Sequence, residues 1–266
     1  MPNLGTWTGL LGLVLLLVLT NASPIDSTGK LVQVEAADKA SRRGKRVILG
    51  LSSKDGAVLI SWARRGGKSL TPLQQLVPLT QYSGIAARGV ASDIGYAQNL
   101  LFEQASQHSL VYSSPIPTGR LARMLADQMH LRTMQRQFRP LGLRTCIAGY
   151  DEDRGCLFEV DVMGNCFECT ASCLGSSVEE EDEIIRAVTT ATTSTIVAEG
   201  QTLATLAKGE EEEENDPLTA LAKLGIRAIR KAASAGNELY DDKEAVFEVA
   251  VVGRNVPFEI RNVGAR

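Results

Sequence analysis

The chain of 266 residues lacks the concentrated positive charge of nucleic-acid-binding proteins. It has 28 Lys and Arg residues against 31 Asp and Glu residues, and its formal net charge is −3. Affinity for a phosphate backbone depends on a clustered basic face. The one basic run, from Arg42 to Arg46, is better explained as the solvated end of a helix. The sequence therefore predicts no nucleic-acid partner.

Histidine is scarce, since the chain has only His108 and His130. Both fall in segments with a helical pattern, and neither accompanies a nucleophile elbow or a strained turn. Ser-His-Asp and Cys-His mechanisms need a histidine beside the nucleophile. We therefore interpret both residues as histidines on helix surfaces.

Cysteine is confined to one region, where alternation directs some thiols inward as small apolar side chains. The five residues are Cys146, Cys156, Cys166, Cys169 and Cys173. The last three have a spacing that suits zinc, but a second pair of ligands is missing. We expect no metal and no cofactor.

Long apolar runs are absent except near the start of the chain. Residues 1–24 carry no charge, and Gly9 to Thr20 is nearly continuous apolar sequence of signal-peptide length, too short to span a bilayer. No Lys or Arg precedes this run. Three explanations stay open: a wrongly assigned gene start or unspliced insert, a targeting signal, or an unusual structured tail. We treat residues 1–28 as an apolar extension and residues 29–266 as one domain with an acidic loop at 209–216.

Strand and helix patterns alternate in blocks along the domain. In the first half, a helical pattern at 31–44 precedes strand pairs at 47–62 and 76–88 and helices at 92–108 and 118–137. In the second half, a strand meander from 143 onward is followed by two helices that open at Ser177 and Asp216, and by a last hairpin at 245–260. Segregated blocks argue against an alternating parallel α/β fold. The predicted class is α+β, a four-layer αββα sandwich of two antiparallel sheets.

The order of short motifs in the second half resembles proteasome subunits of the α type. Arg139-Pro140-Leu141-Gly142 is followed by Gly149-Tyr150-Asp151, then by Asp161 and Gly164, and then by a small-residue strand that ends at Gly175. No single motif is specific, but the ordered set is.

The start of the domain adds to this resemblance. Ser23-Pro24 and the stretch from Gly29 to Ala37 are similar to the α-type signature Ser-Pro-x-Gly-Arg-Leu-x-Gln-Val-Glu-Tyr-Ala, with Lys30 in place of Arg and Ala36 in place of Tyr. The resemblance extends over about residues 23–260. It implies the fold of the N-terminal-nucleophile hydrolases, to which proteasome subunits belong.

Two further stretches, Cys166 to Cys169 and Leu224 to Ile229, look closest to the sixth α paralogue of the eukaryotic ring. This resemblance to one paralogue is weaker than the resemblance to the family.

The resemblance also implies that the chain does not cleave peptides. Catalytic β-type subunits use an N-terminal Thr, whose own amine serves as base, with a Lys and an Asp. Alignment on Asp55-Gly56 places Arg46 at the Thr, Trp62 at the Asp and Gln75 at the Lys. No nucleophile or base remains, so we expect no catalytic residue.

The resemblance implies a subunit that forms a seven-membered outer ring with other α subunits and contacts the β subunits. This ring controls substrate entry and docks the C-terminal tails of regulatory particles or activators. The family acts in ubiquitin-dependent protein degradation in the cytoplasm and nucleus. Gly29, Gln33 and Glu35 match the ring and gate signature. Gln75 occupies the position of the lysine that pairs with an activator's carboxylate. The Tyr-Asp-Arg motif that supports the gate is absent from residues 1–24.

Two other classes of function remain open. A secreted or membrane-associated binding protein on the same fold would need Gly9 to Thr20 to act as a signal. A stand-alone N-terminal-nucleophile hydrolase would need cleavage before a Thr, Ser or Cys that opens the first strand, and Arg46-Val47-Ile48 offers none.

Overall fold

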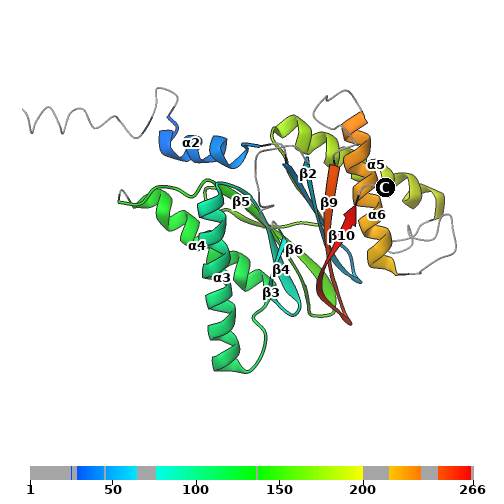
Figure 1. The fold of residues 1–266 in the computed structure, drawn as a ribbon, viewed down its shortest axis with the longest axis horizontal. Coiled ribbons are helices and arrows are strands. Elements are labelled where there is room, and N and C mark those ends of the chain that lie inside the picture. Colours follow the sequence, from blue (N-terminus) through cyan, green and yellow to red (C-terminus); the bar gives the residue numbers. More distant parts are fainter. Residues whose placement is uncertain are drawn as a thin grey trace, which may run out of the picture.

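Two five-stranded antiparallel sheets lie face to face between two layers of helices (Figure 1). The computed structural model describes residues 25, 29–44, 46–64, 76–135, 137–199, 216–234 and 245–264. This arrangement confirms the predicted α+β sandwich. Most of the apolar extension and the acidic loop up to residue 215 lie outside the described residues.

The first sheet has the strand order β10-β9-β2-β1-β8. Its strands are β1 (Arg46–Ser52), β2 (Gly56–Arg64), β8 (Ala171–Leu174), β9 (Ala245–Gly253) and β10 (Val256–Gly264). Helices α5 (Val178–Glu199) and α6 (Pro217–Ser234) cover its outer face, on the right in Figure 1.

The second sheet has the order β3-β4-β5-β6-β7. Its strands are β3 (Leu76–Thr80), β4 (Ser83–Gly89), β5 (Leu143–Asp151), β6 (Arg154–Val160) and β7 (Cys166–Glu168). Helices α3 (Ala91–Tyr112) and α4 (Thr118–Met134) cover it on the left in Figure 1, and α2 (Val32–Ser41) lies against β4 and β5.

Both faces of β1, β4 and β5 are covered, which explains the nearly continuous apolar sequence of these strands. In β1, Val47 and Leu49 pack under α5 and α6, whereas Ile48 points into the core between the sheets. Gly50 also faces that inner core, because a Cβ there would lie 2.7 Å from the Leu157 side chain. The molecule thus has three apolar layers, one between the sheets and one under each helix layer.

The helix predictions hold, apart from their ends. Helix α3 continues past residue 108 to Tyr112, where Ser113 adopts a left-handed conformation with φ of 52°. Helix α4 ends at Met134, before the predicted end at 137. In the described ranges, none of the helices combines the length and apolar character needed to cross a membrane.

The predicted meander from residue 143 is divided between the two sheets. Strand β7 pairs with β6, but β8 pairs with β1 of the opposite sheet. The backbone N–H of Ser52 donates to the carbonyl of Thr170 at 2.8 Å, directly before β8. The chain therefore crosses between the sheets at Thr170, which the local sequence pattern does not indicate.

Candidate functional site

The start of β1, where a cleaving relative would carry its nucleophile, is the first place to inspect. Arg46 opens the strand and pairs with Ala63 of β2. Trp62, aligned with the catalytic Asp, is buried in the core under α5 and α6. Gln75, aligned with the catalytic Lys, lies outside the described residues. Neither described side chain offers a hydroxyl, a thiol or a carboxylate.

Helix α2 leads directly into this strand through a turn at Arg42 to Gly44. Val34 and Ala37 of the helix are buried against the second sheet. Gly142 of the Arg-Pro-Leu-Gly motif permits this approach, because a Cβ there would lie 3.3 Å from the Ala40 Cβ. A helix therefore covers the end of the sandwich at which β1 begins.

The predicted signature residues gather at the exposed N-terminal end of α2. Gly29 adopts φ of +84°, which favours glycine, and Gln33 is exposed. Glu35 forms an ion pair with Lys30 at 3.0 Å. The structure thus brings Gly29, Gln33 and Glu35 together in one region.

A network of largely buried charges, which our sequence analysis missed, links the end of α2 to helix α5 and to the second sheet. Arg144 of β5 donates to Glu181 of α5 at 2.5 Å and to Glu159 of β6 at 2.8 Å. Burial alone would lower the pKa of Arg144, but these two carboxylates outweigh it and raise that pKa. Arg42 donates to the same Glu181 at 3.1 Å.

The side chain of Arg42 is only 22% exposed, so our interpretation of the run from Arg42 to Arg46 as a solvated helix end is wrong for this residue. The reason is tertiary, because Glu181 lies 139 positions along the chain. A glutamate in the first turn of α5, where acidic residues are common, was the one available signal.

Arg88 of β4 holds the C-terminal end of α2. This residue is 3% exposed, and its Nη2 donates to the carbonyl oxygens of Arg42 at 2.9 Å and Gly44 at 2.7 Å. Burial lowers the pKa of Arg88 to about 10, so the side chain stays protonated at neutral pH. A cation at this position suits the negative end of the helix dipole.

The Arg-Pro-Leu-Gly motif has a structural role at the start of α3. Arg139 donates to both carboxylate oxygens of Asp93, at 2.7 and 2.5 Å, and the Gly142 N–H donates to Asp93 at 2.9 Å. Burial raises the pKa of Asp93, but these bonds outweigh it and hold the pKa below its ordinary value. The motif thus fixes the loop before β5 to the helix that follows β4.

The cysteines and histidines show no reactive arrangement in the described residues. All five thiols are free, and burial raises the pKa of Cys146 and of Cys173. His108 lies on α3 and His130 on α4, as predicted. The search for three metal-ligating side chains within reach of each other finds no group among the described residues.

Comparison with known proteins agrees with this architecture. The family model described as "Proteasome subunit" matches residues 42–214, more than half of the chain. Proteasome subunit alpha type-6 of Saccharomyces cerevisiae is 26% identical over 235 residues, which cover 88% of this chain and 89% of the relative.

Two further relatives are 25% identical over 232 residues, or 87% of this chain. Proteasome subunit alpha type-1 of Drosophila melanogaster is covered to 75%, and the probable proteasome subunit alpha type-6 of Schizosaccharomyces pombe to 76%. The chain therefore belongs to the proteasome subunit family, as a noncatalytic subunit of the α type in the 20S core.

Proposed function

We propose that this chain cleaves no peptide bond itself and serves as a structural member of the seven-membered outer ring of the 20S core. The observation that carries the proposal is the start of β1. Arg46 stands where a nucleophile is needed, and α2 runs directly into this strand. A hydrolase of this fold needs a free amino end at a Thr, Ser or Cys there.

Sequencing the amino end of the mature chain tests this part of the proposal. We expect no mature end between residues 42 and 52, because processing there would cut α2 from β1. A mature chain that begins within this interval and hydrolyses a peptide by itself would favour the stand-alone hydrolase instead.

The proposed partners are other α subunits, β subunits and the C-terminal tails of activators, in the cytoplasm and nucleus. Gly29, Gln33 and Glu35 are proposed to serve in ring contacts and gating. Their support is the exposure of the α2 N-terminal end, where Leu31 and Val32 are also exposed.

Native mass spectrometry of the tagged protein from its own cell tests the assembly. Co-migration with related chains in a particle many times heavier than this chain is expected, and recovery only as a free chain would contradict it.

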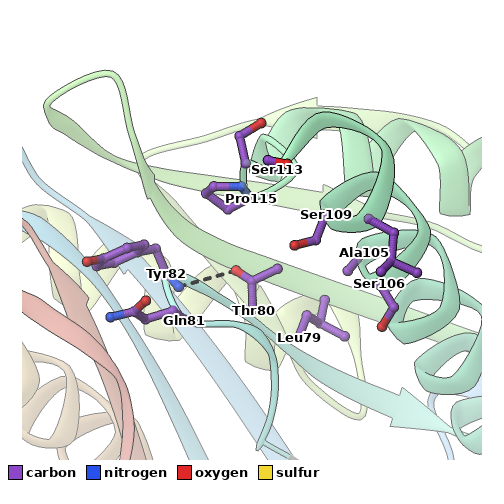
Figure 2. A pocket seen from close by; sticks show the side chains of 11 residues that line it. Leu79, Thr80, Gln81, Tyr82, Ala105, Ser106, Ser109, Ser113 and Pro115 are labelled. Carbon is purple, nitrogen blue, oxygen red and sulfur yellow. Dashed lines mark hydrogen bonds between the residues drawn. The ribbon is translucent and has the colours of Figure 1, made fainter.

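A second surface suited to subunit contacts lies at the C-terminal end of α3. Leu110, Val111 and Tyr112 are 83, 72 and 60% exposed. No Asp, Glu, Lys or Arg occurs from residue 104 to residue 119. A pocket of about 580 Å³ adjoins this surface, between the β3–β4 turn with Tyr82 and the helix end with Ser113 (Figure 2). Interface cores are depleted of charge and enriched in aromatic residues, so we propose that another proteasome subunit covers this surface.

Replacing Leu110 and Tyr112 by Ser should lower incorporation into the large particle by about tenfold, the equivalent of about 1.4 kcal/mol of binding free energy. Native mass spectrometry against an equal amount of wild-type chain measures the change. The control is Val178→Ser, an exposed apolar residue on the opposite helix layer. Equal incorporation of the double variant and the control would contradict the proposed contact.

Activator binding should be weak at the pocket proposed around Gln75. A lysine there would make a charge-assisted bond to a C-terminal carboxylate, worth about 1.5 to 3 kcal/mol, whereas a neutral amide contributes about 1 kcal/mol. Gln75→Lys should therefore raise the affinity for an activator's tail peptide, and a peptide competition assay on the assembled particle measures this. Unchanged affinity would refute a pocket role for this position, which lies outside the described residues.

A further inference from the structure

Helix α2 has few local means of holding its position. It spans ten residues, and isolated helices of that length are marginal in water. Its N-cap residue Leu31 makes no side-chain capping bond. Only Val34, Ala37 and Ser41 of the helix are buried. The helix therefore depends on contacts made from outside it.

Three charged side chains supply such contacts at the C-terminal end of the helix. Arg88 reaches the carbonyl oxygens of Arg42 and Gly44 from the second sheet. Arg42 in turn reaches Glu181 at the start of α5, over the first sheet. Glu181 is itself fixed, because Arg144 and the backbone N–H of Gly175 donate to the same oxygen, Oε1. The end of α2 is thus tied to both halves of the sandwich.

We propose that Arg42, Arg88 and Glu181 form a latch that positions α2 and thereby presents the surface with Gln33 and Glu35 to a neighbouring subunit. The part of this inference that concerns the neighbour rests on the proposed function. The three residues are positioning residues, because they act through α2. Buried ion pairs recover little net stability after desolvation, and specifying one geometry is their best-attested use.

The latch should be sensitive to single substitutions, because the buried side chain of Arg88 is only partly hydrogen-bonded. The buried atoms Nε and Nη1 of Arg88 make no hydrogen bond within the described part of the chain. An incompletely bonded buried guanidinium is costly, and its two bonds to the helix end offset this cost together with the nearby charges of Glu180 and Glu181. Loss of the Arg42–Glu181 ion pair, or of the Arg88 bonds to the end of α2, should loosen the packing of α2 without unfolding the sandwich.

Hydrogen exchange of the full-length chain, followed by mass spectrometry, tests the positioning. Arg42→Gln removes the ion pair with Glu181, and also the contact of Arg42 with Asp38 of α2 at 3.2 Å, and leaves Arg144 with its two carboxylates. Amides of residues 32–41 should then exchange at least tenfold faster, while those of β5 and α4 should keep their wild-type rates. The matched control is Arg43→Gln, the same change at the adjacent exposed residue, for which wild-type rates are expected.

Two more variants separate positioning from a general loss of stability. Arg42→Lys keeps a cation for Glu181 and should restore most of the protection of α2. Arg88→Met removes the donors and fills the buried space, so it should release α2 even where the melting temperature is unchanged. Wild-type exchange of residues 32–41 in both Arg42→Gln and Arg88→Met would overturn the latch.

Incorporation of each variant into the large particle is measured separately, by native mass spectrometry. Faster exchange of α2 together with lower incorporation would support the whole inference. Faster exchange with wild-type incorporation would overturn the presentation of α2 to a neighbour, while the proposed function would stand. A wild-type chain that joins no large particle would overturn the proposed function and the presentation together, whereas the exchange result would still decide the latch.

Discussion

Leu157→Ala is expected to lower the free energy of unfolding by about 4 kcal/mol, within the range of roughly 2 to 5 kcal/mol for buried leucines. Leu157 of β6 is 0% exposed and lies in the core between the two sheets. Its side chain fills the space beside Gly50 of β1. Neither sheet can close the resulting cavity, because each is held on its outer face by a helix layer. Urea unfolding of the full-length chain measures the change.

Leu131→Ala provides the matched control. Leu131 lies on α4 and is 43% exposed, so the same truncation removes less buried apolar surface. We expect a loss below about 1 kcal/mol for this variant. Equal losses for both leucines would contradict the packing of the two sheets against each other.

Asp93→Asn is expected to lower the free energy of unfolding by about 2 to 3 kcal/mol at neutral pH. The amide cannot accept all the bonds that Arg139 and Gly142 donate to the carboxylate, and its NH₂ group would face one of those donors. The loss stays moderate because the Arg139 side chain is largely exposed and its charge is screened by solvent. Thermal or urea unfolding provides the measurement.

The effect of Asp93→Asn should also depend on pH. The folded-state pKa of Asp93 lies below its ordinary value. Its contribution is therefore fully present above that ordinary value, about 4, and is lost as the pH falls through the folded-state pKa. The stability difference between wild type and variant should shrink on acidification. An exposed carboxylate on α5 provides the control, Asp182→Asn, and a difference that grows on acidification would contradict the assignment.

Under the proposed function, a fold suited to peptide cleavage is retained for assembly. In this chain the end of the sandwich at β1 is covered by α2 and held by charged side chains. Exposed apolar side chains at the start of α2 and at the end of α3 are available to partners. The placement of α2 therefore matters more to the proposed role than any reactive side chain does.

Local signals in the sequence predicted the elements well. Asp216 caps α6 as expected, because the Leu218 N–H donates to its Oδ1 at 3.3 Å. Ser177 accepts from the Glu180 N–H at 3.2 Å at the start of α5, and the Glu180 side chain accepts from the Ser176 hydroxyl at 2.8 Å. Such signals depend on residues a few positions apart, so they can be read without the fold.

The candidate site could be predicted only in part. Gly29, Gln33 and Glu35 were identified by resemblance, and the structure places them in one region, at the start of α2. For Arg42, Arg88 and Glu181 the local sequence offered only the position of Glu181 in the first turn of α5, because an ion pair is recognisable only when both partners are known. Arg42 and Glu181 are separated by 139 positions, and Arg88 and Gly44 by 44.

The sequence by itself determined the class of fold and most of the elements, because hydrophobic periodicity, caps and turns act over short distances along the chain. The family was identified by the resemblance of its ordered motifs. Only the tertiary structure decided that β8 joins the first sheet and that Arg42, expected to be solvated, is partly buried in an ion pair with Glu181. Both outcomes depend on contacts between segments that are far apart in the sequence, which form as the two sheets pack. Short-range sequence patterns do not specify these contacts.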